Sequence, residues 1–337
     1  MEQERQRTPT VTVIICAYAD ERWNDLVAAV ASVQRQQPSE IIVVIDHNQR
    51  LLERARKRFT TAMIVPNTRP RGLSGARNCG LACATGMVVA FLDDDATVAP
   101  EWLPRLRAAY HDKRVLGVGG PVEPAWTSAR PRWFPDEFDW VVGCTYRGLP
   151  EEPAAVRALI GANMSMRREV FETVGDFHGG VGRVGARPVA GEETELCIRA
   201  RQRWPERFWL YEPGVRVRHR VPHQRASFAY FRARAFGEGM SKARISRLVG
   251  VSDGTAAERA YTFRTLPRGI RRNLLGVFRR GDLFGFARGG AIVVGLAFTM
   301  AGYLTGTIAD ILAMRNGQPN WLRVEHKQQP QDDPATR

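Results

Sequence analysis

The sequence predicts an α/β fold with a mostly parallel central sheet and flanking helices. In the first hundred residues, short apolar runs rich in β-branched residues alternate with segments of helical spacing, and the links between them are short. Two of the apolar runs end directly in aspartate, at 46 and at 93–95. Strand–helix–strand repetition is typical of parallel sheets, whose ligands bind at the carboxyl edge.

Four strands are expected in this part of the chain, because continuous apolar runs are typical of strands covered on both faces. The runs lie at 11–17, 41–45, 62–65 and 87–92. Helical spacing predicts helices between them, at 23–34, 51–59 and 73–84.

The middle of the chain is less regular. A helix is expected from Glu101 and a strand at 115–118, followed by a long irregular excursion at 119–153 that is rich in Pro, Gly and Trp. The later elements are expected as follows: regular structure at 159–166, a short helix from 167, a Gly-rich mobile loop at 179–191, a helix at 192–203, strands at 208–211 and 215–219, and a helix at 226–242. Long excursions on compact domains are usually functional.

The C-terminal segment has a different character. Residues 266–280 place apolar residues at helical spacing between arginines, as amphipathic helices on anionic bilayers do. Residues 289–309 form an uncharged stretch that is long enough to span a bilayer. The alternative is a hydrophobic helical hairpin that docks on the catalytic domain or lies in the interface. We therefore expect a disordered N-terminus at 1–9, a catalytic domain at 10–245, a helical membrane-associating region at 246–313 and a polar tail at 314–337.

Composition excludes several classes of protein. With 337 residues, 44% hydrophobic and 25% charged, the chain is neither disordered nor a disulfide scaffold. Its net charge of +14 favours nucleic acid, an anionic membrane or a phosphorylated ligand as a partner, and the basic residues near the apolar C-terminal stretch favour the membrane over nucleic acid. Five cysteines without a close His predict buried thiols in a reducing compartment and no zinc site. The first nine residues lack the apolar core of a signal peptide, so we expect the protein to fold in the cytoplasm.

The strongest chemical signal is the triplet Asp93, Asp94 and Asp95 directly after a buried strand. In an extended segment Asp93 and Asp95 point to the same side, where two carboxylates suit Mg²⁺ or Mn²⁺. A solvated turn that caps a helix is the alternative. Asp46 ends another strand and, in the same crevice, can hydrogen-bond a base or a ribose.

Three further features extend this site. The turn at 72–78 holds Ser74 and Arg77 at a helix start, which attracts phosphate. The first turn of the helix expected after the Gly-rich loop holds Glu192, Glu193 and Glu195. Either one of them is a general base, or their charges only stabilise the helix through its dipole. His219 is the last residue of a short expected strand, and it is either a third metal ligand or a structural residue.

These segments, taken in order, resemble glycosyltransferase family 2, the inverting nucleotide-sugar enzymes of GT-A fold. The resemblance covers roughly residues 10–242 and rests on Ala17–Tyr18, the strand ending at Asp46, the turn at 72–78, the strand ending in Asp93–Asp95, Gly161 to Arg167, and Gly191 to Cys197. Two departures are visible. Glu192–Glu193 stands where the family has Glu-Asp, which leaves open which carboxylate takes the proton, and Asp46 is followed by His47 rather than by a second acid.

The resemblance implies a role for each site residue. Glu193, or its neighbour Glu192, is the catalytic base. Asp93, Asp95 and His219 hold Mn²⁺ or Mg²⁺. The donor is contacted by Ala17, Tyr18, Asp46, Arg77, Asp93 and Asp94.

The implied reaction moves a hexose-type sugar from a nucleotide donor, expected to be a UDP-sugar, to a hydroxyl of a glycan or lipid-linked saccharide. The product has inverted configuration, and the missing Gln-x-x-Arg-Trp motif predicts a non-processive enzyme. The expected place is the cytoplasmic face of the cell membrane, in polysaccharide or cell-envelope biosynthesis. A nucleotidyltransferase and a non-catalytic membrane-bound scaffold of transferase-like fold are the alternatives.

Overall fold

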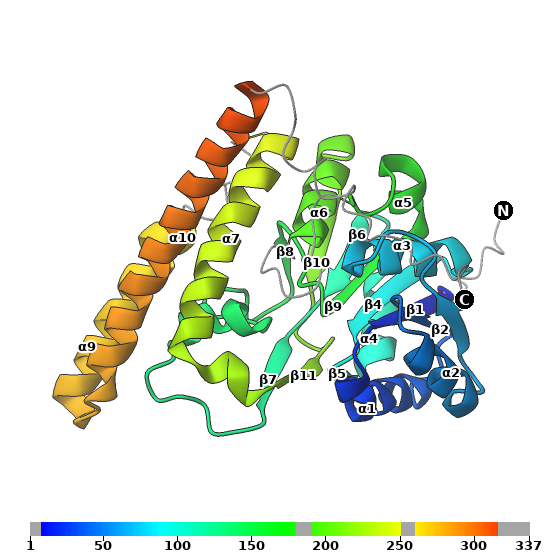
Figure 1. Ribbon diagram of the computed structural model, residues 1–337, viewed down its shortest axis with the longest axis horizontal. Helices are drawn as coiled ribbons and strands as arrows, with labels where there is room; N and C mark the ends of the chain where they lie inside the picture. The colour runs from blue at the N-terminus through cyan, green and yellow to red at the C-terminus, as the bar shows by residue number, and fades with distance from the viewer. Residues whose placement is uncertain (1–7, 180–190, 251–259, 316–337) are drawn as a thin grey trace, which may run out of the picture.

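The computed structural model describes residues 8–179, 191–250 and 260–315. Its central element is an eight-stranded sheet of order β3-β2-β1-β4-β9-β6-β10-β8 (Figure 1). Its strands are β1 (Val11–Ala17), β2 (Glu40–Ile45), β3 (Met63–Pro66), β4 (Val88–Asp93), β6 (Val115–Gly119), β8 (Ala154–Val156), β9 (Asn163–Arg167) and β10 (Phe208–Tyr211). β1, β2, β3 and β4 are mutually parallel, and β9 is antiparallel to both of its neighbours.

Helices cover both faces of this sheet. α1 (Trp23–Gln34), α2 (Gln49–Arg58) and α4 (Trp102–Ala109) pack their apolar sides on one face; α3 (Leu73–Cys83), α5 (Arg168–Val174) and α6 (Glu192–Arg203) pack on the other. Short helical turns η1 (Asp20–Arg22), η2 (Asp136–Val142) and η3 (His223–Ala226) lie in the connections. The local sequence explains the helix ends: the Asn48 side chain caps α2 by accepting a hydrogen bond from the Leu51 amide at 3.0 Å.

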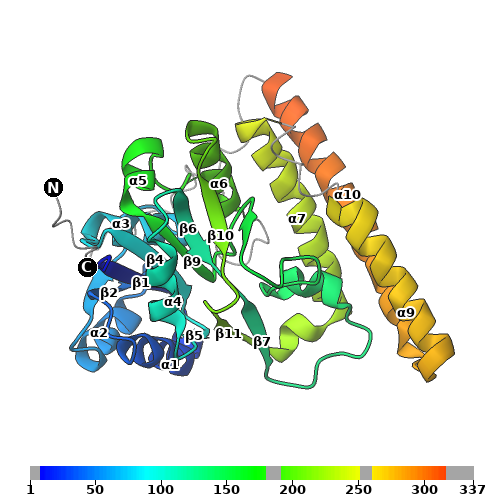
Figure 2. The same cartoon turned by 180° about the vertical axis from the view of Figure 1, so that it is seen from behind.

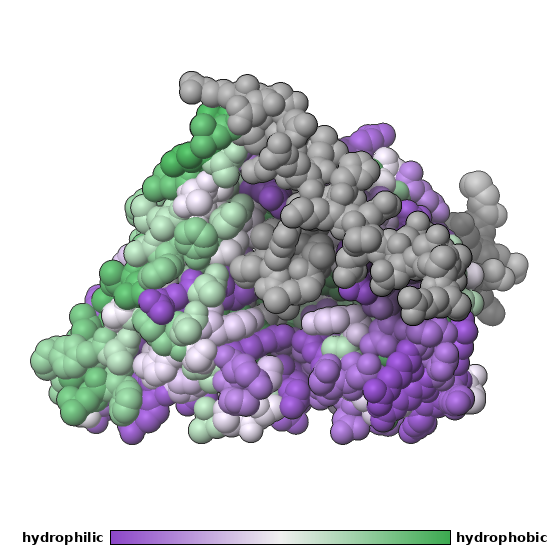
Figure 3. All heavy atoms as spheres, in the orientation of Figure 1, coloured by the Kyte–Doolittle hydropathy of each residue, from purple (hydrophilic) through white to green (hydrophobic). Residues whose placement is uncertain are grey.

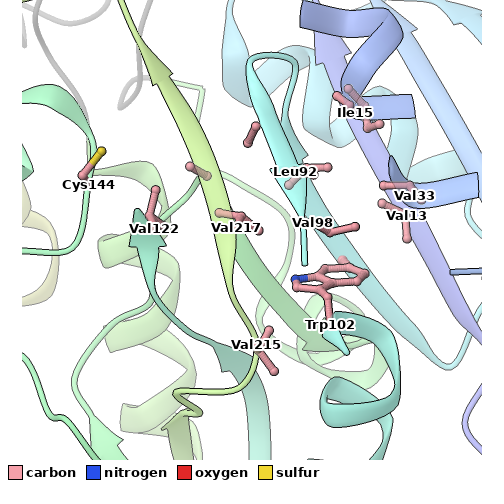
Figure 4. Close-up of a cluster of buried hydrophobic side chains, with 14 of the residues drawn as sticks. Val13, Ile15, Val33, Leu92, Val98, Trp102, Val122, Cys144, Val215 and Val217 are labelled. Carbon is pink, nitrogen blue, oxygen red and sulfur yellow. The ribbon is translucent and has the colours of Figure 1, made fainter. Parts of the chain in front are cut away.

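The core on the α1 side is continuous between the sheet and a second, three-stranded sheet. Figure 4 shows Val13, Leu92, Val98 and Trp102 converging with Val217 in this region, and all five side chains are buried. Trp102 also donates a hydrogen bond to Asn163 at 2.9 Å, which satisfies its indole nitrogen inside the core. The two sheets are thereby held as one packed unit.

The smaller sheet has the order β5 (Ala96–Val98), β11 (Val217–Val221) and β7 (Val122–Trp126). β5 begins directly after the aspartate triplet, and β11 pairs with it antiparallel, so that His219 lies opposite Ala96. The register thus brings His219 to the acidic turn. In addition, the Arg220 amide donates a hydrogen bond to the Asp95 carbonyl at 2.8 Å.

The predicted strands and helices of the first hundred residues are confirmed to within two residues at their ends, because buried apolar runs mark them clearly. β5, β7 and β8 were not expected, because three to five residues with mixed polarity carry little pattern. The excursion at 119–153 contains β7 and η2 and is therefore more regular than expected. Asp93 is the last residue of β4, and residues 94 and 95 form a turn before β5, so the triplet is not one extended segment as the prediction assumed. The predicted loop at 179–191, the predicted N-terminus at 1–9 and the polar tail at 314–337 lie largely outside the described residues.

Three helices form a layer at one edge of the molecule (Figures 1 and 2). They are α7 (Phe228–Val249), α9 (Leu266–Arg280), which continues from the π-helical turn η4 (Tyr261–Thr265), and α10 (Phe284–Arg315). α10 packs along α7, while Leu266 and Val277 of α9 are buried. The apolar stripe at 266–280 is therefore used partly for packing within the protein, and Leu275 and Phe278 remain exposed.

Candidate functional site

The carboxyl ends of β1, β2 and β4 meet at one edge of the sheet. The register pairs Ala17 with Ile45 and Cys16 with Asp93, so Ala17, Asp46 and Asp93 lie at the same level. A cavity of about 980 Å³ opens there. Every predicted site residue lines it, namely Ala17, Tyr18, Asp46, Arg77, Asp93, Asp94, Asp95, Glu192, Glu193 and His219. This volume is in the range of small-molecule sites.

Asp93, Asp95 and His219 form the acidic end of the cavity. One ligand atom from each lies within 4.8 Å of the others. Asp95 Oδ1 is buried, accepts no hydrogen bond, and lies 3.1 Å from His219 Nε2. Two carboxylates and an imidazole with an unsatisfied buried oxygen form a donor set that fits Mn²⁺ or Mg²⁺.

Arg22 is a residue of this site that sequence reasoning missed. Its guanidinium lies 2.5 Å from Asp94 Oδ1 and 3.0 Å from Asp95 Oδ2, and Arg225 approaches the same Asp95 oxygen at 4.0 Å. Burial would raise the pKa of Asp95, but His219 and Arg22 outweigh burial and hold it below its ordinary range. Burial raises the pKa of Asp94 to about 7, with Arg22 opposing that rise. No local pattern marks Arg22 or Arg225, because their role depends on tertiary contacts.

Asp46 is fixed at the end of β2 by three neighbours. It accepts hydrogen bonds from Asn67 Nδ2 at 2.7 Å and from the Gly72 amide at 3.0 Å, and His47 Nδ1 lies 2.7 Å from it. The Gly72 amide at the start of α3 is thus directed at the Asp46 carboxylate. Gly72 adopts a φ of 126°, which favours glycine at this turn.

The second acidic group comes from the start of α6. Gly191 is the N-cap of α6, and its φ of 109° favours glycine; a Cβ there would also lie 2.5 Å from Ile245 Cδ1 of α7. Glu192 is buried; its Oε1 accepts from Arg77 at 2.7 Å and its Oε2 from the Gly191 amide at 3.1 Å. Glu193 is half-buried and lines the cavity. Burial and the adjacent Glu192 raise the pKa of Glu193 to about 8.

Arg77 connects the two acidic groups. Besides Glu192, its guanidinium contacts the Gly161 carbonyl at 3.1 Å and Asp93 Oδ1 at 3.7 Å. A Cβ on Gly161 would lie 2.9 Å from Arg77 Nη2 and 3.6 Å from Glu193 Cδ, so these groups are close neighbours. The Arg77 side chain is nearly fully buried, and both of its terminal nitrogens contact protein atoms.

The cavity continues past Glu193 to α7 and η4. This part is lined by Arg157, Arg234, Glu238, Lys242 and Tyr261. Lys242 Nζ and Arg234 Nη2 lie 3.9 and 3.7 Å from the two oxygens of Glu238. Two cations, Arg234 and Lys242, thus lie beside the single carboxylate of Glu238 on this wall of the cavity.

With this geometry in place, the comparisons with known proteins are informative. Residues 12–175 match Glycosyl transferase family 2. The chain is 36% identical over 238 residues to a glucosyl-dolichyl phosphate glucuronosyltransferase of Haloferax volcanii, covering 69% of this chain and 76% of the relative. The chain belongs to glycosyltransferase family 2.

Other comparisons agree with this assignment. The family 2 chain is 25% identical over 248 residues to the succinoglycan biosynthesis protein ExoM of Rhizobium meliloti, covering 70% of this chain and 74% of the relative. Its fold is similar to that of the mannosyltransferase PcManGT from Pyrobaculum calidifontis, solved in complex with GDP-Man and Mn²⁺. That similarity has a TM-score of 0.57 at 19% identity and covers 91% and 88% of the two chains. The GT-A-type α/β fold expected from the sequence is confirmed, and the protein is a glycosyltransferase.

Proposed function

We propose that this glycosyltransferase moves a hexose-type sugar from a nucleotide donor, a UDP-sugar in the first instance, to a hydroxyl of a glycan or lipid-linked acceptor. The observation that carries the proposal is that two carboxylates, Asp93 and Asp95, line one cavity together with His219 and a separate glutamate, Glu193. Family membership favours this reaction over a nucleotidyltransferase or a non-catalytic scaffold.

Asp93, Asp95 and His219 would hold Mn²⁺ or Mg²⁺. When bound, such an ion neutralises the charge that develops on a leaving diphosphate. The Mn²⁺ complex of the mannosyltransferase with a similar fold supports this choice of ion. Asp46 at the end of β2 and the exposed ring of Tyr18, with Ala17 beside it, would bind the nucleoside.

Glu193 is proposed as the general base. It removes the proton from the acceptor hydroxyl, whose oxygen attacks the anomeric carbon on the face opposite the leaving nucleoside diphosphate. An α-linked donor then gives a β-linked product. Both oxygens of Glu192 are already engaged by Arg77 and the Gly191 amide, so Glu192 positions the helix start rather than taking the proton.

The acceptor is proposed to be a lipid-linked saccharide that carries phosphate. Arg234 and Lys242 of α7 line the cavity, as does Arg157, and a phosphate would find charge-assisted hydrogen bonds with such side chains. The named acceptor of the Haloferax volcanii relative, glucosyl-dolichyl phosphate, supports this class. We further propose that the C-terminal helices associate with the cytoplasmic face of the cell membrane, where such acceptors are held. The absence of the processive motif supports a single transfer.

The test is a product analysis with the purified full chain. Nucleotide sugars are incubated with Mn²⁺ and a polyprenyl-phosphate saccharide, nucleoside diphosphate release is measured, and the lipid product is identified by mass spectrometry. We expect donor-dependent release of nucleoside diphosphate and an acceptor heavier by one sugar unit. Release of inorganic diphosphate instead would indicate a nucleotidyltransferase, and the absence of donor binding by calorimetry with Mn²⁺ would indicate a scaffold.

A further inference from the structure

The outward side of α10 is a continuous apolar face. Val293, Met300, Leu304, Ile308 and Ile311 recur at helical spacing, and each exposes between 46% and 59% of its surface. Figure 3 shows the hydrophobic surface gathered over α9 and α10 at this edge of the molecule. A continuous apolar face of this length on the solvent-exposed surface of a protein is typical of an interaction site.

The opposite side of α10 is in backbone contact with α7. A Cβ on Gly302 would lie 2.0 Å from the Phe236 carbonyl oxygen, and one on Gly239 would lie 2.0 Å from the Thr299 carbonyl oxygen. At the far end Asp310 of α10 lies 3.6 Å from Arg247 of α7. Because the two backbones touch along several turns, α7 and α10 form one rigid pair.

α7 is a charged helix and forms a wall of the catalytic cavity. Arg234, Glu238 and Lys242 face the cavity, while Gly239 and Phe236 face α10. If α10 crossed a bilayer in this arrangement, α7 would cross beside it, and these charges would enter the hydrocarbon core. Charged side chains at that depth are strongly unfavourable, so the packed pair is incompatible with a spanning helix.

The side of α9 that faces solvent carries positive charge. Arg268, Arg271 and Arg279 are exposed and recur with Leu275 and Phe278 at intervals of three or four residues, so they share one face. Arginines beside exposed apolar side chains are typical of helices that lie at an anionic membrane surface. Charge complementarity thus identifies an anionic lipid leaflet as the occupant of this face.

We propose that α10 does not cross the membrane. It lies in the plane of the anionic leaflet, with the face of Val293, Met300 and Leu304 in the lipid and the arginines of α9 at the headgroups. This inference rests on the membrane association proposed above and goes beyond it, because length and composition alone would allow Phe284–Leu312 to span. Both ends of α10 then remain on the side of the catalytic cavity.

The first experiment tests the lipid-facing side chains. Flotation of the full chain with phosphatidylglycerol vesicles is compared for Met300→Asp and for Met87→Asp, whose methionines expose 56% and 58% of their surface on different parts of the molecule. We expect Met300→Asp to lower vesicle partitioning about tenfold and Met87→Asp to leave it unchanged. Circular dichroism melting verifies that both variants fold. Equal flotation of the two variants would overturn the assignment of this face.

The second experiment tests the charge. Arg271→Gln with Arg279→Gln is compared with Arg56→Gln and Arg58→Gln on the exposed side of α2. The α9 pair is expected to weaken binding to anionic vesicles several-fold at low salt, and the α2 pair is not. Identical losses for the two pairs would mean that net charge alone, and not α9, attracts the vesicles.

The third experiment distinguishes in-plane from spanning helices. Epitope tags at both ends of the chain are exposed to protease in inside-out membrane vesicles and in intact spheroplasts. An in-plane α10 predicts that both tags are cut in the vesicles and neither in the spheroplasts. A C-terminal tag that is protected in the vesicles would overturn the in-plane orientation and leave membrane association intact. A wild-type chain that does not float with any vesicles would overturn both the in-plane orientation and membrane association itself. The transferase reaction is measured separately with a detergent-solubilised acceptor, so its outcome is independent of these results.

Discussion

Replacing Glu193 by Gln tests the proposed base through two independent quantities, turnover and stability. The substitution keeps the size of the side chain and removes its ability to accept a proton. Because a positioned general base contributes about 10²- to 10⁴-fold to a rate, kcat should fall by that factor while donor affinity stays within about twofold. In the wild type, kcat/KM should rise with pH through a limb near 8, since the carboxylate must be deprotonated.

The stability effect follows from the same buried charge. Burial and Glu192 raise the pKa of Glu193 from 4.5 to about 8, so the folded state binds a proton that the unfolded state has lost between these two values. Wild-type stability therefore decreases as pH rises from 4.5 to 8. The shift corresponds to at most roughly 5 kcal/mol, and water on the cavity side of this half-buried group reduces the effect to about 1 to 3 kcal/mol.

The assay is urea denaturation of wild type and Glu193→Gln at pH 5 and pH 9, with turnover measured in parallel. The variant should gain about 1 to 3 kcal/mol of unfolding free energy relative to the wild type between pH 5 and pH 9. Glu172→Gln, the same change on the exposed side of α5, is the control and should show neither effect. Normal turnover by Glu193→Gln, or a stability difference that does not change with pH, would refute the reasoning.

Three further substitutions test the remaining contacts. Asp95→Asn should weaken Mn²⁺-dependent nucleotide binding by at least about tenfold in calorimetry, and unchanged affinity would exclude Asp95 as a ligand. Arg22→Met leaves Asp94 buried without its cation, so the unfolding free energy measured in urea should fall by about 2 kcal/mol at pH 8. The loss should be smaller at pH 5, where Asp94 is protonated. An equal loss at both pH values would contradict this expectation. Gly239→Leu should separate α7 from α10 and destabilise the chain by about 3 kcal/mol in thermal melting. Gly276→Leu on α9 is the control and should be tolerated, because a Cβ at Gly276 meets no atom within 4 Å. Similar melting of both variants would argue against the tight helix pair.

The sequence predicted the sheet and its helices well because their signals are local. A buried parallel strand such as 11–17 is a continuous apolar run, and α6 begins directly after the glycine that the sequence marks, Gly191. β5 and β8 were missed because they have three residues each, and their strand conformation depends on partners more than fifty residues away. Pattern reasoning has no access to such pairing.

The same distinction applies to the site. Asp46, Asp93 and Glu193 were predicted because each directly follows the end of a strand or the start of a helix, and such ends converge in an open sheet. The position of Asp95 was right for a different reason: the turn at 94–95 and the pairing of β11 with β5 bring it to His219, not an extended strand. The counter-charge from Arg22 and Arg225 arises only in the folded chain.

The structure places the two consecutive glutamates, Glu192 and Glu193, in different surroundings. Arg77 is nearly fully buried between Glu192 and Asp93, so its positive charge attracts both the start of α6 and the end of β4. Glu192 is thereby neutralised by a direct ion pair with Arg77. Glu193 lines the cavity, and Arg77 only partly offsets the effects of burial and Glu192, so the pKa of Glu193 is raised. A carboxylate that is poorly stabilised as an anion and open to the substrate is better suited to take a proton than one fixed in an ion pair. We therefore propose that Arg77 positions both acidic groups, so its substitution should affect metal binding and the pH dependence of turnover together.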